Sequence, residues 1–113
     1  MAEKKVIEIG PEQANAWLQT NNAILLDVRE DTELEVEWIP GATTMPLSKL
    51  NAETIAKLTV SKVVIICLTG RRSKEAGQRL LEQGILHVYS VKDGLLAWNA
   101  AGLETVNQSA LLI

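Results

Sequence analysis

The chain has 113 residues, with 11 basic and 14 acidic side chains, a formal net charge of −3 and one cysteine. Its length fits a single domain over residues 1–113, with a core over about 6–106 and a tail over 107–113, that buries roughly 65% of its unfolded surface. The charge gives no support for nucleic-acid binding, no apolar run approaches the ~18 residues of a membrane span, and the single cysteine excludes an internal disulfide and favours a reducing, cytoplasmic location.

Segments typical of strands and helices alternate along the first half of the chain. Residues 5–9 predict a short strand, and a Gly-Pro pair then opens a helix. The apolar run 23–28 predicts a strand that is covered on both faces, as strands in parallel sheets are. Residues 30–39 fit neither pattern, and residues 41–46 predict a short further strand.

The alternation continues through the second half. The predicted elements are a helix over 50–58, a strand over 62–67, a helix over 73–83, a strand over 87–91 and a helix over 94–101. Gly84 ends the second of these helices, and Asp93 and Gly102 are placed to cap the two ends of the last one. Strands that alternate with helices in this way predict an α/β domain with a mainly parallel sheet.

The cysteine, Cys67, lies where a buried strand is predicted to end and a basic turn begins, in "CLTGRRS". Ligands of parallel sheets bind at this edge, where loops lead into helix N-termini. Backbone N–H groups of the turn, the positive end of the next helix, and the charges of Arg71, Arg72 and Lys74 would favour the thiolate over the thiol. An inert, buried cysteine is the alternative, but its place before a glycine turn and paired arginines favours a reactive one.

The spacing of this loop separates two cysteine chemistries. Cysteine-dependent phosphatases hold phosphate in a loop of the form Cys-x-x-x-x-x-Arg, but here that last position is Ser73 and the arginine, Arg72, comes one residue earlier. The shorter loop fits a smaller electrophile. Residues 67–73 instead match Cys-x-x-Gly-x-Arg-Ser, the active-site loop of rhodanese-like sulfurtransferases.

The resemblance to that family covers residues 6–106. "LLDVRE", "IPGATTMPL" and "VYSVKDGLLAW" are similar, in this order, to further signatures of the family. It implies a rhodanese-like α/β fold with about five strands in a mainly parallel sheet and helices on both faces. Two departures stand out: Glu37 and Trp38 replace a usual Gly-His pair, and Asp93 and Gly94 replace a Gly-Gly pair. The first alters a segment that commonly lies near the active site.

The resemblance also implies a reaction. The Cys67 thiolate would attack the outer sulfur of thiosulfate or a related donor, and a cyanide or thiol acceptor would then take the sulfur from the resulting persulfide, with no metal or other cofactor. Backbone donors of the substrate-binding loop would hold the outer sulfur and the departing anion, from Leu68, Thr69, Gly70, Arg71 and Arg72. We expect Arg72 either to tie the loop to a carboxylate or to hold the anionic donor.

Supporting residues are expected on the same edge of the sheet. Asp27 and Arg29 end the second apolar run, where they would form a salt bridge or approach the loop, and Ser73 closes the loop motif. Glu33 matches an acid that supports the site in the family, with a solvated surface charge as the alternative. His87 has no partner at metal-ligand spacing, so we expect it to be structural.

Three tryptophans and the tail complete the candidates. Trp17 and Trp98 have the helical spacing of core residues, whereas Trp38 has acidic neighbours and could form one wall of the pocket. The tail either packs on the domain or serves as a docking peptide.

Three function classes remain open. The first is an enzyme that turns over a small sulfur donor. The second is a persulfide carrier for a partner protein, and a protein could also be the acceptor of the sulfur. The third is a non-catalytic interaction module, against which the intact cysteine and the basic loop argue.

Overall fold

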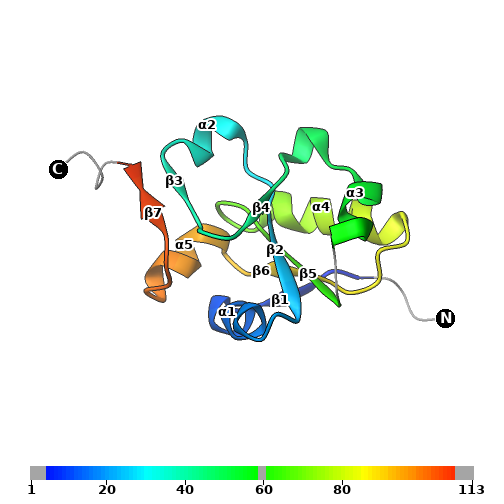
Figure 1. Ribbon diagram of the computed structural model, residues 1–113, viewed down its shortest axis with the longest axis horizontal. Helices are drawn as coiled ribbons and strands as arrows, with labels where there is room; N and C mark the ends of the chain where they lie inside the picture. Colours follow the sequence, from blue (N-terminus) through cyan, green and yellow to red (C-terminus); the bar gives the residue numbers. More distant parts are fainter. Residues whose placement is uncertain (1–4, 59–60, 109–113) are drawn as a thin grey trace.

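A computed structural model describes residues 5–58 and 61–108, and its centre is a five-stranded sheet with the order β1-β6-β5-β2-β4 (Figure 1). All neighbouring strands in this sheet run parallel. The strands are β1 (Ile7–Ile9), β2 (Ala23–Asp27), β4 (Thr43–Thr44), β5 (Lys62–Ile66) and β6 (Val88–Val91). The predicted fold class is confirmed, and β5 lies at the centre of the sheet.

Helices cover both faces of this sheet. They are α1 (Pro11–Gln19), α2 (Asp31–Leu34), α3 (Ala52–Leu58), α4 (Arg71–Glu82) and α5 (Gly94–Ala100), with a 3-10 turn over Leu47–Lys49. Helices α1 and α5 lie on one side and α3 and α4 on the other (Figure 1). Within the described residues, no helix is long and apolar enough to cross a membrane.

The alternation of side chains along β5 explains why both faces are apolar. Val63, Ile65 and Cys67 pack in the core beneath α3 and α4, whereas Val64 and Ile66 pack in the core beneath α1 and α5. Each of these side chains is at most 1% exposed. A continuous apolar run is therefore needed to fill both layers, and it ends at the cysteine.

The unassigned segment 30–39 contains the short helix α2 and one strand of a second sheet. In that sheet β3 (Glu37–Trp38) pairs antiparallel with β7 (Val106–Asn107), and the Gln108 N–H donates to the Val36 carbonyl at 2.8 Å. Residues 107 and 108, assigned to the tail, thus take part in backbone pairing. Residues 109–113, where the rest of the tail falls, lie outside the described residues.

The start of α4 and the capping of α5 differ from the sequence prediction. Helix α4 begins at Arg71, two residues earlier than predicted, because Gly70 adopts φ +97° and its carbonyl accepts the Lys74 N–H. Asp93 does precede α5, but its side chain does not cap the helix. Instead, the N–H groups of Leu95 and Leu96 donate to the carbonyls of Cys67 and Leu68, at 2.8 and 3.3 Å. The cysteine loop itself therefore caps α5.

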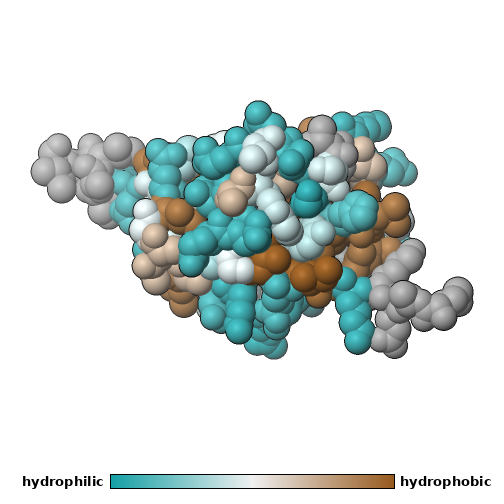
Figure 2. Space-filling view, turned by 90° about the horizontal axis from the view of Figure 1, so that it is seen from below, coloured by the Kyte–Doolittle hydropathy of each residue, from teal (hydrophilic) through white to brown (hydrophobic). Residues whose placement is uncertain are grey.

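The surface on the α1 side is mostly hydrophilic. Figure 2 shows this face from below, with hydrophobic side chains in small groups among larger hydrophilic areas.

Candidate active site

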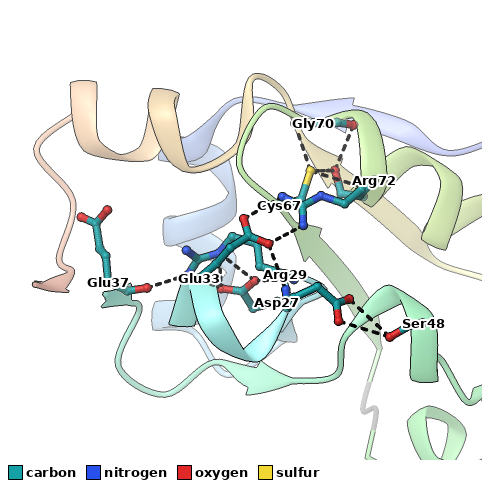
Figure 3. Close-up of polar contacts among 10 residues, drawn as sticks. Asp27, Arg29, Glu33, Glu37, Ser48, Cys67, Gly70 and Arg72 are labelled. Carbon is teal, nitrogen blue, oxygen red and sulfur yellow. Dashed lines mark hydrogen bonds and ion pairs between the residues drawn. The ribbon is translucent and has the colours of Figure 1, made fainter. Parts of the chain in front are cut away.

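Cys67 directly follows β5, at the carboxyl edge of the sheet, and its side chain is fully buried. The chain then turns through Gly70 into α4, so that the first turn of the helix closes around the sulfur (Figure 3). The Gly70 N–H lies 3.1 Å from the Sγ atom and the Ser73 N–H lies 3.3 Å from it. Two backbone donors thus point at one sulfur, as the glycine turn predicts.

These contacts make Cys67 more acidic than a free cysteine. Burial raises the pKa of the thiol, but the hydrogen bond with the Ser73 side chain and those from the backbone N–H groups of Ser73, Gly70 and Thr69 outweigh it and lower the pKa below its ordinary value. The nucleophilic thiolate therefore forms at a lower pH than in an unperturbed cysteine.

Arg72 makes a bidentate ion pair with Glu33, whose oxygens lie 2.5 and 2.9 Å from its guanidinium nitrogens. This contact lowers the pKa of the Glu33 carboxyl and raises that of Arg72. Both side chains are about one-third exposed, at 30% and 32%. Of the two roles expected for Arg72, the structure shows the carboxylate contact, and Figure 3 shows it beside Cys67.

Helix α2 is built to present Glu33. In its capping box the Glu30 side chain accepts the Glu33 N–H, and the Glu33 side chain accepts the Glu30 N–H at 3.0 Å. The carboxylate is thus oriented by its own helix before it meets Arg72. A solvated surface charge, the alternative for Glu33, does not describe this arrangement.

Asp27 and Arg29 form a buried ion pair at the end of β2, with the closest contact at 2.9 Å. Both residues are at most 2% exposed. The Arg29 guanidinium also donates to the Glu37 carbonyl at 3.0 Å, so the pair connects β2 to β3 (Figure 3). The Glu37 side chain in turn accepts hydrogen bonds from Asn99 and Thr105, at 3.2 and 3.1 Å. Glu37, which replaces a family glycine, therefore holds the second sheet against α5.

The remaining loop residues face outward. Leu68 is 38% exposed, and Thr69 and Arg71 are exposed as well. Lys74, expected to add charge near the sulfur, instead has its ammonium 3.9 Å from the Glu8 carboxylate of β1. Arg71 and Arg72 are therefore the loop cations nearest the site.

The other candidates lie in the framework. Trp17 packs edge-on against Tyr89 with ring centroids 4.7 Å apart, and Trp98 is buried and donates to the Glu104 carbonyl at 3.0 Å. Trp38 is half-buried opposite Val106 in the second sheet. His87 is exposed, and its carbonyl accepts the Val63 N–H. Within the described residues, no group of three or more His, Cys, Asp or Glu side chains could hold a metal ion.

Two surface cavities are separate from the cysteine loop. One of about 350 Å³ lies between α1, β2 and residues 39–43, and one of about 420 Å³ lies beside residues 84–87. The lining of neither includes a residue of the loop 67–73.

Sequence reasoning missed two residues at the site. Ser90 of β6 is fully buried, and its Oγ atom lies 2.6 Å from Ser73 Oγ. A hydroxyl within an apolar strand was the available signal. Gly94 lies so close to the loop that a Cβ atom there would come within 2.2 Å of the Cys67 carbonyl oxygen. The only sequence feature that pointed to this role of Gly94 is a glycine shortly after the last long strand.

Residues 10–101, which contain Cys67 and the loop around it, match the rhodanese-like domain family. The chain belongs to that family. A thiosulfate sulfurtransferase, GlpE, from Pseudomonas savastanoi is 37% identical over 93 residues, which are 81% of this chain and 86% of that protein. An uncharacterized Synechocystis protein is 36% identical over 88% of this chain, which spans 56% of that protein's length. The family predicted from the loop motif is confirmed.

Solved structures agree with the fold. The thiosulfate sulfurtransferase of Pseudomonas aeruginosa superimposes with a TM-score of 0.80 at 27% sequence identity. The match covers 90% of this chain and 20% of that one. The fold and the family are thus shared with sulfurtransferases, some of them longer proteins.

Proposed function

We propose that this protein transfers a sulfane sulfur from thiosulfate, or a donor of the same kind, to a thiophilic acceptor through a persulfide on Cys67. The observation that carries the proposal is the Cys67 sulfur, which receives the Gly70 and Ser73 N–H groups at 3.1 and 3.3 Å. The lowered pKa of the thiol supports the same role. The relatives named thiosulfate sulfurtransferase support the choice of donor.

The proposed reaction has two displacement steps. The Cys67 thiolate attacks the outer sulfur of thiosulfate, the donor's S–S bond breaks, and sulfite leaves with the bonding electrons. Cyanide or a thiolate then attacks the outer sulfur of the persulfide, and Cys67 departs as the thiolate. The N–H groups of residues 68–72 stabilise the negative charge on the outer sulfur in both steps.

Thiocyanate formation from thiosulfate and cyanide, read beside the intact mass after treatment with thiosulfate alone, tests the proposal. We expect catalytic turnover and a mass gain of one sulfur atom. The Cys67→Ser variant, which is similar in volume, should show neither while its circular dichroism spectrum stays that of the wild type. Sulfur uptake by the serine variant would overturn the assignment of the nucleophile.

Aryl phosphate hydrolysis is the matched negative reaction. The loop from Cys67 to Arg72 is one residue shorter than a phosphatase loop, and Arg72 is tied to Glu33. Both features disfavour a phosphoryl group at the sulfur. Efficient hydrolysis without sulfur uptake would contradict the proposed function.

A persulfide carrier that serves a partner protein is the second candidate. The ion pair with Glu33 favours it, because that carboxylate offsets the charge of Arg72, which a small anionic donor would otherwise meet. A carrier would gain one sulfur atom from a protein persulfide but release little thiocyanate with thiosulfate. Turnover with thiosulfate supports the enzyme, and the absence of any persulfide would leave an interaction module.

A further inference from the structure

Ser90 lies outside the cysteine loop, yet it is connected to the sulfur through one side chain. Its Oγ atom lies 2.6 Å from Ser73 Oγ, and Ser73 Oγ lies 3.6 Å from the Cys67 sulfur. All three residues are fully buried. Their hydroxyl and thiol hydrogens therefore have to be satisfied by one another or by nearby backbone.

The positions of the acceptors fix the direction of these hydrogen bonds. Ser73 Oγ lies 3.1 Å from the Gly70 carbonyl, to which it donates its own hydrogen. Within residues 5–58 and 61–108, Ser73 Oγ is the hydrogen-bond partner of Ser90 Oγ. Ser90 must therefore donate to Ser73, whose second lone pair accepts the thiol hydrogen of Cys67.

Ionisation of Cys67 changes what Ser73 has to do. Once the thiol hydrogen has left, a Ser73 lone pair faces the thiolate unless the Ser73 hydrogen turns from the Gly70 carbonyl to the sulfur. The Gly70 carbonyl remains satisfied after that turn, because it also accepts the Lys74 N–H at 3.3 Å. Ser90 goes on donating to Ser73 and strengthens it as a donor, since hydrogen bonds in a chain polarise one another.

We propose that Ser90 is a positioning residue, whose hydroxyl donates to Ser73 Oγ in both states and so leaves the Ser73 hydrogen free to turn to the Cys67 sulfur. This inference rests on the proposed function only in taking Cys67 to react as a thiolate. Ser90 touches neither the sulfur nor a substrate, so it acts through Ser73. The same contact serves the anionic persulfide.

The test is the pH dependence of Cys67 alkylation by iodoacetamide, a small neutral reagent. Ser90→Ala should raise the pKa read from this profile by about half to one pH unit, because one hydrogen bond to the anion's donor is lost. Ser61→Ala is the matched control, since Ser61 is exposed and its hydroxyl donates to the Asn22 carbonyl at the other end of β5. It should leave the profile unchanged.

A second comparison separates this role from a merely structural one. Ser73→Ala should also raise the pKa, and adding Ser90→Ala to it should give no further shift, because the connection is already broken. If the two shifts add, Ser90 acts without Ser73 and the proposal is wrong. An unchanged profile in folded Ser90→Ala would also overturn it.

The other charged groups around the sulfur stay in place in these variants. They are Arg71 and Arg72 of α4, Glu33 of α2, the Asp27–Arg29 pair at the end of β2, and Lys92 and Asp93 in the turn between β6 and α5. If Ser90→Ala fails to fold, Ser90→Thr and Ser90→Val are compared instead, because threonine and valine have nearly equal volumes and only threonine keeps the hydroxyl. Threonine should keep the wild-type profile and valine should not.

Alkylation needs no sulfur donor, so the result is independent of the proposed function. If the protein makes no thiocyanate but shows the predicted pKa shifts, the proposed function is wrong and the role of Ser90 is supported. If the protein transfers sulfur but the variants show no such shifts, the proposed function is supported and the role of Ser90 is wrong.

Discussion

At the scale of single residues, Arg72 lies among several negative groups, of which Glu33 and the Cys67 thiolate act on it most. Glu33 holds it in the ion pair, and the Cys67 thiolate attracts it as well, which raises the pKa of Arg72 further. The carboxylate therefore competes with the sulfur, and with any anionic donor, for one positive charge. The balance between Arg72 and Glu33 should set how the site treats anions.

Neutralising each partner in turn should have opposite effects. Arg72→Gln should slow persulfide formation with thiosulfate about tenfold relative to iodoacetamide alkylation, because an unpaired Glu33 then repels the donor. Glu33→Gln should raise the same ratio about two- to threefold, because Arg72 is released. The measurement is the pair of second-order rate constants for each variant.

The control for this pair is Arg79→Gln. Arg79 and Glu75 form an ion pair on α4 at 2.7 Å, with both side chains about half exposed and away from the loop. Its removal should leave the ratio of rate constants unchanged. Equal losses with both reagents in the Arg72 and Glu33 variants would instead indicate collapse of the loop.

At the scale of elements, α5 and the cysteine loop depend on each other. The loop carbonyls of Cys67 and Leu68 accept the first N–H groups of α5, and Gly94 brings the two backbones together. Gly94 has φ +50°, and a Cβ atom would lie 2.2 Å from the Cys67 oxygen and 2.6 Å from the Leu68 oxygen. No side chain can be added there unless the loop moves.

Gly94→Ala should therefore disturb stability and reactivity together. We expect a loss in the free energy of unfolding about 1 to 3 kcal/mol larger than that of Gly102→Ala, together with a changed pH profile of Cys67 alkylation. Gly102 has φ +74° with nothing within 4 Å of its Cβ position, so its alanine variant costs only about 1 to 2 kcal/mol of backbone strain. Denaturant unfolding and alkylation check this, and equal losses in the two variants would contradict it.

This element also shows where prediction from sequence stops. Cys67, Gly70 and Arg72 were found because their chemistry lies within six consecutive residues, and β2 and β5 because four consecutive residues of each strand are apolar. Ser90 and Gly94 acquire their roles only when β6 and α5 are brought to the loop. Likewise, β3 is two residues long and exists through its pairing with β7, which no local pattern encodes.

At the scale of the whole molecule, acidic side chains outnumber basic ones, and several of them lie on and beside the helix that presents Glu33. The formal net charge is −3, and Glu30, Asp31 and Glu35 on and beside α2 are exposed. Glu33 and Asp27 are already paired with arginines, so Arg71 is the exposed cation on the loop. A dianionic donor such as thiosulfate would therefore meet these exposed carboxylates as it approaches the loop.

Salt should accordingly speed up the reaction with thiosulfate. Raising NaCl from about 10 to 200 mM shortens the screening length from roughly 30 to below 8 Å, so the repulsion by these carboxylates weakens. We expect the rate constant for persulfide formation to rise while that for iodoacetamide stays constant. A rate that falls with salt would mean that Arg71 governs the approach.

The central place of β5 has a consequence for how the molecule opens. Strand β5 is paired with β2 on one side and with β6 on the other, and the side chains of residues 63–66 are almost fully buried. We therefore expect its amides to exchange with solvent only when the whole domain unfolds. Helix α2 has four residues and β3 and β4 have two each, and such elements open locally at far lower free energy. The nucleophile is thereby fixed to the most persistent part of the molecule, and the carboxylate that restrains its arginine to one of the least persistent.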